Sequence, residues 1–158
     1  MQARMSTDSA RLSEIYTHCS PVRFTHTDPA GYVFFPRFFE MFQAAVEEWF
    51  NRCLQINYAD LILKHGIGFP TAHTECDFLR PCRLGEVLEL DLVLEKIGRT
   101  SFTLRFNGHI GAEARLRARS VLVAIELQQG RPQPLVPVLK SRLEIYLETC
   151  RRHNEKQR

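Results

Sequence analysis

The chain has 158 residues, a formal net charge of +3 and 44% hydrophobic residues. A single globular domain of this length buries about 70% of its unfolded surface, so we expect a core that needs no disulfides. The charge is too small to indicate a nucleic-acid partner, and no apolar run reaches the roughly 18 residues that span a bilayer. Five cysteines without a Cys-x-x-Cys pair, and an N-terminus without an apolar signal segment, predict a reduced, cytoplasmic protein with no metal site.

Phenylalanine is unusually frequent, with 11 residues against four tyrosines and one tryptophan. Seven of the 11 lie between Phe24 and Phe50, so this part of the chain needs an explanation. Before it, residues 1–18 are polar, show no clear period and are expected to form an N-terminal extension. The alternation of apolar and polar residues from Pro21 to Thr27 predicts a short, half-buried strand.

A turn separates this strand from a long helix. Pro29 disfavours the helical conformation at Asp28, and Gly31 permits a positive φ, so Asp28 lies on the turn. Apolar side chains then recur at helical spacing over 35–53, beside Pro36, a residue favoured at the first helical position. The apolar sector is wide, which predicts a helix sheathed by other structure rather than one lying on a surface.

The hydrophobic period changes to two after a short second helix over 57–65. Four consecutive strands are predicted over 69–78, 86–97, 101–110 and 115–127. In the last strand the apolar phase slips near Ser120, which indicates a β-bulge or a strand end buried on both faces. A terminal amphipathic helix is predicted over 140–152.

This order of a strand, a long helix and four antiparallel strands indicates the α+β class. The simplest arrangement is a curved antiparallel sheet of about five strands wrapped around the long central helix, with a C-terminal helix added. The chain is thereby divided into an extension over 1–18, a main domain over 19–139, and a C-terminal helix and tail over 140–158.

Asp28 is the first candidate for chemistry. It lies between a strand end and the N-terminus of a buried helix, where free N–H groups and the helix dipole stabilise negative charge. Such a terminus can stabilise a developing oxyanion, and a nearby carboxylate can act as a nucleophile or as a general base toward water. This combination favours hydrolysis of an activated carbonyl. Aspartate is also a good turn residue before proline, so a purely structural role stays open.

The segment from Phe24 to Pro36 reads Phe-x-x-x-Asp-Pro-Ala-Gly-x-Val-x-Phe-Pro. It resembles the signature of hotdog-fold acyl-CoA thioesterases, in particular the 4-hydroxybenzoyl-CoA thioesterase family and the Tol-Pal-associated acyl-CoA thioesterases. The resemblance continues through the aromatic helix and resumes at 80–86 and at 98–102. It implies an acyl-CoA thioester hydrolase of the hotdog fold. Coenzyme A is then part of the substrate, and no further cofactor is implied.

The resemblance also implies roles for individual residues. Asp28 matches the catalytic carboxylate, the backbone N–H of Phe35 matches the donor that polarises the thioester carbonyl, and Gly31 matches the turn that approaches the substrate. The segment matched to the phosphates of coenzyme A comprises Arg99, Thr100 and Ser101. The active site of this family lies between two subunits, which implies a homodimer or a homotetramer.

Substrate specificity is less defined by these residues. Members specific for 4-hydroxybenzoyl groups have a carboxylate two turns into the helix, where this chain has Gln43. We therefore expect an aromatic or a short to medium acyl group, with His26, Tyr32 and Gln43 as candidate substrate-binding residues. Two alternatives stay open: a hotdog hydratase or dehydratase that uses His26, and an acyl-thioester-binding module without catalysis.

Three arginines at alternating positions, Arg115, Arg117 and Arg119, predict a basic ridge along the last strand. Such a ridge fits contacts to phosphates and fits an exposed strand face equally well. Glu47 and Glu48 on the central helix are expected at a subunit interface or in solvent.

Overall fold

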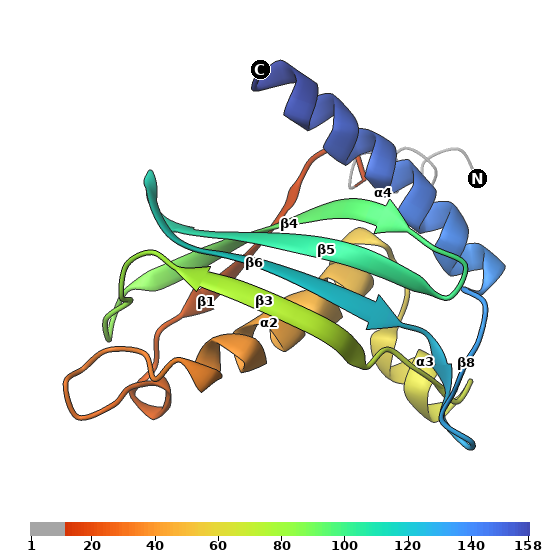
Figure 1. Cartoon of the computed structure of the whole chain (residues 1–158), viewed down its shortest axis with the longest axis horizontal. Coiled ribbons are helices and arrows are strands. Elements are labelled where there is room, and N and C mark those ends of the chain that lie inside the picture. The colour runs from red at the N-terminus through yellow and green to blue at the C-terminus, as the bar shows by residue number, and fades with distance from the viewer. Residues whose placement is uncertain (1–11) are drawn as a thin grey trace, which may run out of the picture.

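The computed structural model describes residues 12–158, so residues 1–11 of the expected N-terminal extension lie outside the described part of the chain. Five antiparallel strands form one sheet in the order β1-β4-β5-β6-β3 (Figure 1). Their bounds are β1 Tyr16–Pro21, β3 Thr71–Phe78, β4 Val87–Ile97, β5 Ser101–Ile110 and β6 Glu113–Val123. The α+β class and the four consecutive strands are therefore confirmed, with boundaries within a few residues of those predicted.

The first strand lies earlier in the chain than predicted. β1 ends at Pro21 and pairs with β4, whereas Phe24–His26 form a 3-10 turn, η1, so the strand predicted over 21–27 is wrong. Local hydrogen bonds stabilise this segment in place of strand pairing. For example, Thr27 Oγ1 donates to Phe24 O at 2.8 Å. Short polar side chains offer the backbone such alternatives to a strand ladder.

The central helix is confirmed, although it is short for a helix expected to be long. It consists of α2 (Pro36–Glu48), which continues directly into a π-helical turn, η2 (Trp49–Cys53), closed by the Leu54 N–H donating to Trp49 O at 3.0 Å. One face is buried throughout: Phe38, Met41, Phe42, Ala45, Val46, Trp49, Phe50 and Cys53. The phenylalanines along this face, Phe38, Phe42 and Phe50, are thus core packing, as the apolar spacing predicted, whereas Phe24, Phe34 and Phe35 are exposed.

The C-terminal helix, α4, runs from Pro137 to Lys156, longer than the predicted 140–152, and packs against β4 (Figure 1). A short helix, α3 (Tyr58–Leu63), and a small second sheet of β2 (Ile67–Gly68), β7 (Ile125–Glu126) and β8 (Arg131–Pro132) complete the fold. None of the helices within residues 12–158 is both long and apolar enough to cross a bilayer.

The β-bulge expected near Ser120 in β6 lies instead in β3, the strand that pairs with it. Burial along β6 alternates without a break from Leu116 to Leu122, and the register shift lies in β3, between Thr71 and His73. Ser120 is buried on the inner face because its hydroxyl forms a 2.8 Å hydrogen bond with Thr74 Oγ1. A polar side chain with a hydrogen-bond partner can occupy a core position. Ser120 therefore interrupts the apolar pattern of the sequence although the strand is regular there.

Candidate active site

Asp28 is held in a tight turn directly before α2. Its carboxylate oxygen Oδ1 accepts hydrogen bonds from the backbone N–H groups of Ala30, at 2.9 Å, and Tyr32, at 3.3 Å. The backbone closes the same turn, since the Gly31 N–H donates to Asp28 O at 3.0 Å. Gly31 has a φ of 79°, the positive value that the sequence predicted for it. The turn thus fixes Oδ1, and within residues 12–158 no hydrogen bond is formed to Oδ2.

The turn is joined to a second loop, 79–86, by backbone pairing. The Val33 N–H donates to Cys82 O at 2.9 Å, and the Leu84 N–H donates to Gly31 O at 3.0 Å. Tyr32 and Arg83 form an isolated β-bridge, and the guanidinium of Arg83 lies 5.4 Å from the centroid of the Tyr32 ring. The position of the Asp28 turn therefore depends on a loop about 50 residues further along the chain.

The start of α2 presents a free hydrogen-bond donor. The Phe34 N–H donates to His26 O, Pro36 has no N–H, and the Arg37 N–H donates to Phe34 O. Among residues 12–158 the backbone N–H of Phe35 has no hydrogen-bond partner, and this residue is 58% exposed. An unpaired backbone donor at a helix N-terminus, a few residues after a fixed carboxylate, is an arrangement that can activate a carbonyl group.

His26 does not join Asp28 in the way the sequence suggested. The predicted strand would have placed both side chains on one face, but the 3-10 turn directs the His26 ring back, where Nδ1 accepts from the Arg23 N–H at 2.9 Å. His26 contributes its backbone to the site instead, since its carbonyl accepts the Phe34 N–H.

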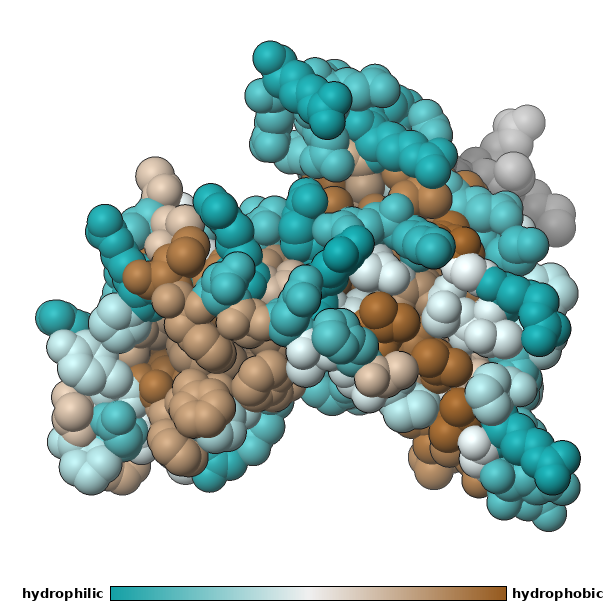
Figure 2. All heavy atoms as spheres, in the orientation of Figure 1, coloured by the Kyte–Doolittle hydropathy of each residue, from teal (hydrophilic) through white to brown (hydrophobic). Residues whose placement is uncertain are grey.

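Aromatic side chains surround this helix start. Phe35 lies between Phe34 and Phe78, with ring centroids 5.7 and 6.2 Å away, and Phe78 also contacts Phe38 at 5.4 Å. Figure 2 shows the resulting hydrophobic patch over the beginning of α2 and the end of β3. The partly exposed rings provide an apolar surface beside the free N–H of Phe35.

A cavity of about 270 Å³ opens further along α2, between this helix and the sheet. Its lining comprises Phe39, Phe42, Gln43, Val46, Thr71, Thr74, Phe106, Ser120 and Leu122. Phe42 and Phe106 stack at 4.9 Å, and Gln43 Nε2 donates to the Tyr58 hydroxyl at 3.2 Å. Burial raises the pKa of Tyr58 although this hydrogen bond opposes the effect. The cavity is mostly apolar, with a few hydroxyl and amide groups at its wall.

The segment matched to coenzyme A lies far from Asp28 within one chain. Arg99 and Thr100 belong to the β4–β5 connection and Ser101 begins β5, and Figure 1 shows this connection at the opposite end of the sheet from the start of α2. This connection is well anchored, because the carbonyls of Arg99 and Thr100 accept the Leu135 and Ala124 N–H groups at 3.0 and 2.7 Å. A single chain therefore does not bring the two groups of predicted site residues together.

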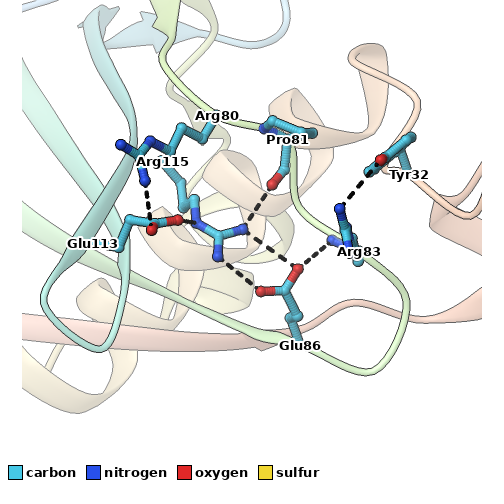
Figure 3. Close-up of polar contacts among 7 residues, drawn as sticks. All are labelled: Tyr32, Arg80, Pro81, Arg83, Glu86, Glu113 and Arg115. Atoms are coloured by element: carbon cyan, nitrogen blue, oxygen red, sulfur yellow. Dashed lines mark hydrogen bonds and ion pairs between the residues drawn. The ribbon is translucent and has the colours of Figure 1, made fainter.

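Sequence reasoning missed several residues of these surroundings. The strand residues that line the cavity, Thr74, Phe106 and Ser120, come from three different strands, and no local signal relates them to α2. The basic ridge was predicted wrongly in one position: Arg117 and Arg119 are exposed, but the Arg115 side chain is only 13% exposed and is surrounded by carboxylates (Figure 3).

Comparison with known proteins identifies the family. The model of the Thioesterase-like superfamily matches residues 22–143, most of the described chain. A 1,4-dihydroxy-2-naphthoyl-CoA hydrolase from Nostoc punctiforme is 30% identical over 140 residues, which cover 89% of this chain and 91% of that protein. The chain therefore belongs to the Thioesterase-like superfamily and is a thioester hydrolase, as the motif around Asp28 predicted.

Solved structures share the fold. A 1,4-dihydroxy-2-naphthoyl-CoA thioesterase from Synechocystis superposes with a TM-score of 0.74 at 24% identity, over 81% of this chain and 94% of that one. A gentisyl-coenzyme A thioesterase superposes with a TM-score of 0.75 at 20% identity, over 81% of this chain and 99% of that one.

Proposed function

We propose that this protein hydrolyses an aromatic acyl-CoA thioester to the free acid and coenzyme A, with Asp28 as the reacting carboxylate. The single observation that supports the chemistry most strongly is the pairing of a fixed carboxylate with an unpaired helix-start donor, the N–H of Phe35. The thioester carbonyl oxygen accepts from this N–H, and the positive end of the α2 dipole stabilises the charge that develops on that oxygen.

Two routes to the products use the same geometry. Asp28 attacks the carbonyl carbon, expels the thiolate of coenzyme A and forms an anhydride that water then cleaves, or it removes a proton from water that attacks directly. In both routes the carbon–sulfur bond breaks and the thiolate takes a proton. A single turnover in H₂¹⁸O tests for the anhydride: label in Asp28 with an unlabelled product acid shows that an anhydride formed and was opened at Asp28, whereas direct attack of water places the label in the product acid.

The apolar cavity supports an aromatic acyl group. Its volume of about 270 Å³ lies below the roughly 300–1,000 Å³ of sites for whole drug-sized ligands, so it suits an acyl group better than an entire coenzyme A ester. Aromatic side chains form much of its wall, and Gln43 offers an amide to a polar ring substituent. The names of the relatives point in the same direction, since they act on dihydroxynaphthoyl and gentisyl thioesters. His26 and Tyr32 then border the site beside the catalytic turn.

A site that uses both Asp28 and Arg99 needs two copies of the chain, because these residues lie at opposite ends of one sheet. β3 offers the place for the second copy. It is an edge strand, seven of its eight residues are exposed, and its unpaired backbone groups can pair with another strand. We therefore propose a homodimer, alone or paired into a homotetramer. In this assembly the thioester group of the substrate lies at Asp28 of one subunit, and its coenzyme A nucleotide contacts Arg99, Thr100 and Ser101 of the other.

The test is a panel of thioesters scored by release of free thiol. We expect hydroxylated benzoyl- and naphthoyl-CoA to react faster than straight-chain acyl-CoA, and Asp28→Asn to lower kcat by about 10²–10⁴. An Asp28→Asn enzyme with near-normal turnover would refute the assignment. Hydration of an enoyl thioester without thiol release would favour the hydratase, and tight binding without turnover would favour a binding module.

A further inference from the structure

Arg115 lies at a β-bulge. The pairing of β5 with β6 shifts between Gly108 and His109, which pair with Leu116 and Ala114, so Arg115 has no partner residue in β5. Bulges of this kind redirect a side chain away from the regular alternation of the strand. This explains why Arg115 leaves the predicted ridge while Arg117, two residues along, stays exposed.

Oxygen atoms of three residues surround the guanidinium of Arg115, although its Nε has no partner with hydrogen-bond geometry in the described part of the chain (Figure 3). Nη2 lies 2.9 Å from Glu86 Oε2, Nη1 donates to Pro81 O at 2.6 Å, and Nε lies 2.7 Å from Glu113 Oε1. Burial alone would lower the pKa of Arg115, but the hydrogen bond and charge of Glu86 raise it, so the group stays charged. Because Glu86, Glu113 and Pro81 hold the guanidinium against protein oxygens, we expect no phosphate of the substrate at Arg115.

These partners place Arg115 against the loop that supports the catalytic turn. Its main chain adds two more bonds, because Arg115 O accepts the N–H groups of Leu79 and Arg80 at 2.9 and 3.1 Å. Glu86 in turn accepts the Arg83 N–H at 2.7 Å. One residue of β6 thus holds loop 79–86 at its beginning, at Pro81 and at its end.

The same loop holds the turn that contains Asp28. Cys82 O and the Leu84 N–H, which lie between the contacts of Arg115, bond to Val33 and Gly31. Apart from these bonds the turn is secured mainly by its own short-range bonds around Asp28, and its tip at Pro29 is exposed. Displacement of loop 79–86 would therefore move Gly31 and Val33, and with them the carboxylate relative to the N–H of Phe35.

We propose that Arg115 is a positioning residue for thioester hydrolysis: it holds loop 79–86 in the shape that sets the Asp28 turn against the start of α2. The inference builds on the proposed role of Asp28. It assigns Arg115 no contact with substrate, so its loss affects the chemical step rather than the binding of coenzyme A.

The test compares Arg115→Met with Arg117→Met, a matched loss of an exposed arginine on the same strand. Steady-state kinetics on the best thioester of the panel are measured at a temperature where both variants are fully folded by circular dichroism. We expect Arg115→Met to lower kcat at least tenfold with KM within about twofold, and Arg117→Met to change neither by more than twofold. A rise in KM of Arg115→Met at unchanged kcat would overturn the proposal in favour of a substrate contact.

A double-mutant cycle separates positioning from general structural damage. If Arg115 acts through Asp28, the Arg115→Met change lowers the residual rate of Asp28→Asn by less than twofold; a full additional tenfold loss would refute positioning. If Arg115→Met does not fold, Glu86→Gln is used instead. We expect Glu86→Gln to lower kcat at least threefold at unchanged KM. Normal activity of this variant would overturn the proposal. Near-normal turnover of Asp28→Asn would instead remove the proposed function itself, so the two failures are distinguishable.

Discussion

Tyr146 lies on the C-terminal helix, and its hydroxyl bridges two strands of the sheet. It donates to Leu92 O at 2.6 Å and accepts the Tyr16 N–H at 2.9 Å, and the side chain is fully buried. Tyr16 and Leu92 are register partners of β1 and β4, so the hydroxyl stands where a direct backbone bond would otherwise join the strands. Burial raises the pKa of Tyr146 far above its usual value, so the hydroxyl stays protonated and remains a donor.

Replacing Tyr146 with Phe removes both bonds and leaves the two backbone groups without their partner. A net hydrogen bond contributes about 0.5–1.5 kcal/mol, and a buried group left unsatisfied costs about 1–3 kcal/mol. Because Tyr16 is only partly buried, we expect the free energy of unfolding to fall by about 2–3 kcal/mol. For a chain of this size that corresponds to a decrease in Tm of roughly 4–12 °C.

Equilibrium unfolding in urea, at one fixed protein concentration, measures this change. Tyr58→Phe is the matched control, since its buried hydroxyl accepts a single 3.2 Å bond from the exposed amide of Gln43. We expect it to lose less than about 1 kcal/mol. A loss below about 0.5 kcal/mol for Tyr146→Phe, or one equal to that of the control, would refute the bridging role.

Three further predictions concern packing, substrate binding and acid stability. Gly108→Ala places a Cβ 2.6 Å from Leu116 Cγ in a central strand, so we expect a loss of about 1–3 kcal/mol in urea unfolding; an unchanged midpoint would show that the core can relax there. Arg99→Ala should raise KM for a coenzyme A ester and leave KM for the matching pantetheine ester unchanged, and equal effects on both would exclude a nucleotide contact. Burial would raise the pKa of Glu86, but the hydrogen bonds and charge of Arg115 hold it below the usual value. The stabilisation by Glu86 is therefore complete above its ordinary pKa of about 4.3 and is lost as pH falls through the lower folded pKa. Wild type and Glu86→Gln should converge in unfolding free energy as pH falls below about 4.3, and parallel curves would contradict this.

The long helix and the four consecutive strands were predictable because their signals are repetitive. Apolar residues recur along 35–53 at a spacing that only a helix places on one face, and along 86–110 at the spacing of a strand. The segment 21–27 shows the limit of this reasoning. Its few alternating residues are too short a pattern, and local hydrogen bonds such as that of Thr27 to Phe24 O form a turn instead.

The expected placement of His26 and Asp28 on one strand face is wrong for the same reason, because a 3-10 turn forms where a strand was assumed; the role of His26 in substrate binding stays a prediction. The Asp28 turn itself was predictable, because proline and glycine restrict its backbone within four residues. The resemblance implied a role for the N–H of Phe35, and a free donor at that place agrees with the unpaired N–H groups that every helix start has. Asp28, Gly31 and Phe35 are therefore the candidate site residues that the chain specifies locally.

The sequence by itself determined the turn at Asp28 and the helix that follows it, because both depend on residues close together in the chain, and its short motifs determined the family resemblance. Only the tertiary structure decided that Arg115 supports loop 79–86, that Tyr146 joins β1 to β4, and that Arg99 lies at the far end of the sheet from Asp28. These relations depend on strand register and on one β-bulge. A shift of one residue in register reverses which face each side chain occupies, and periodicity alone does not contain that information.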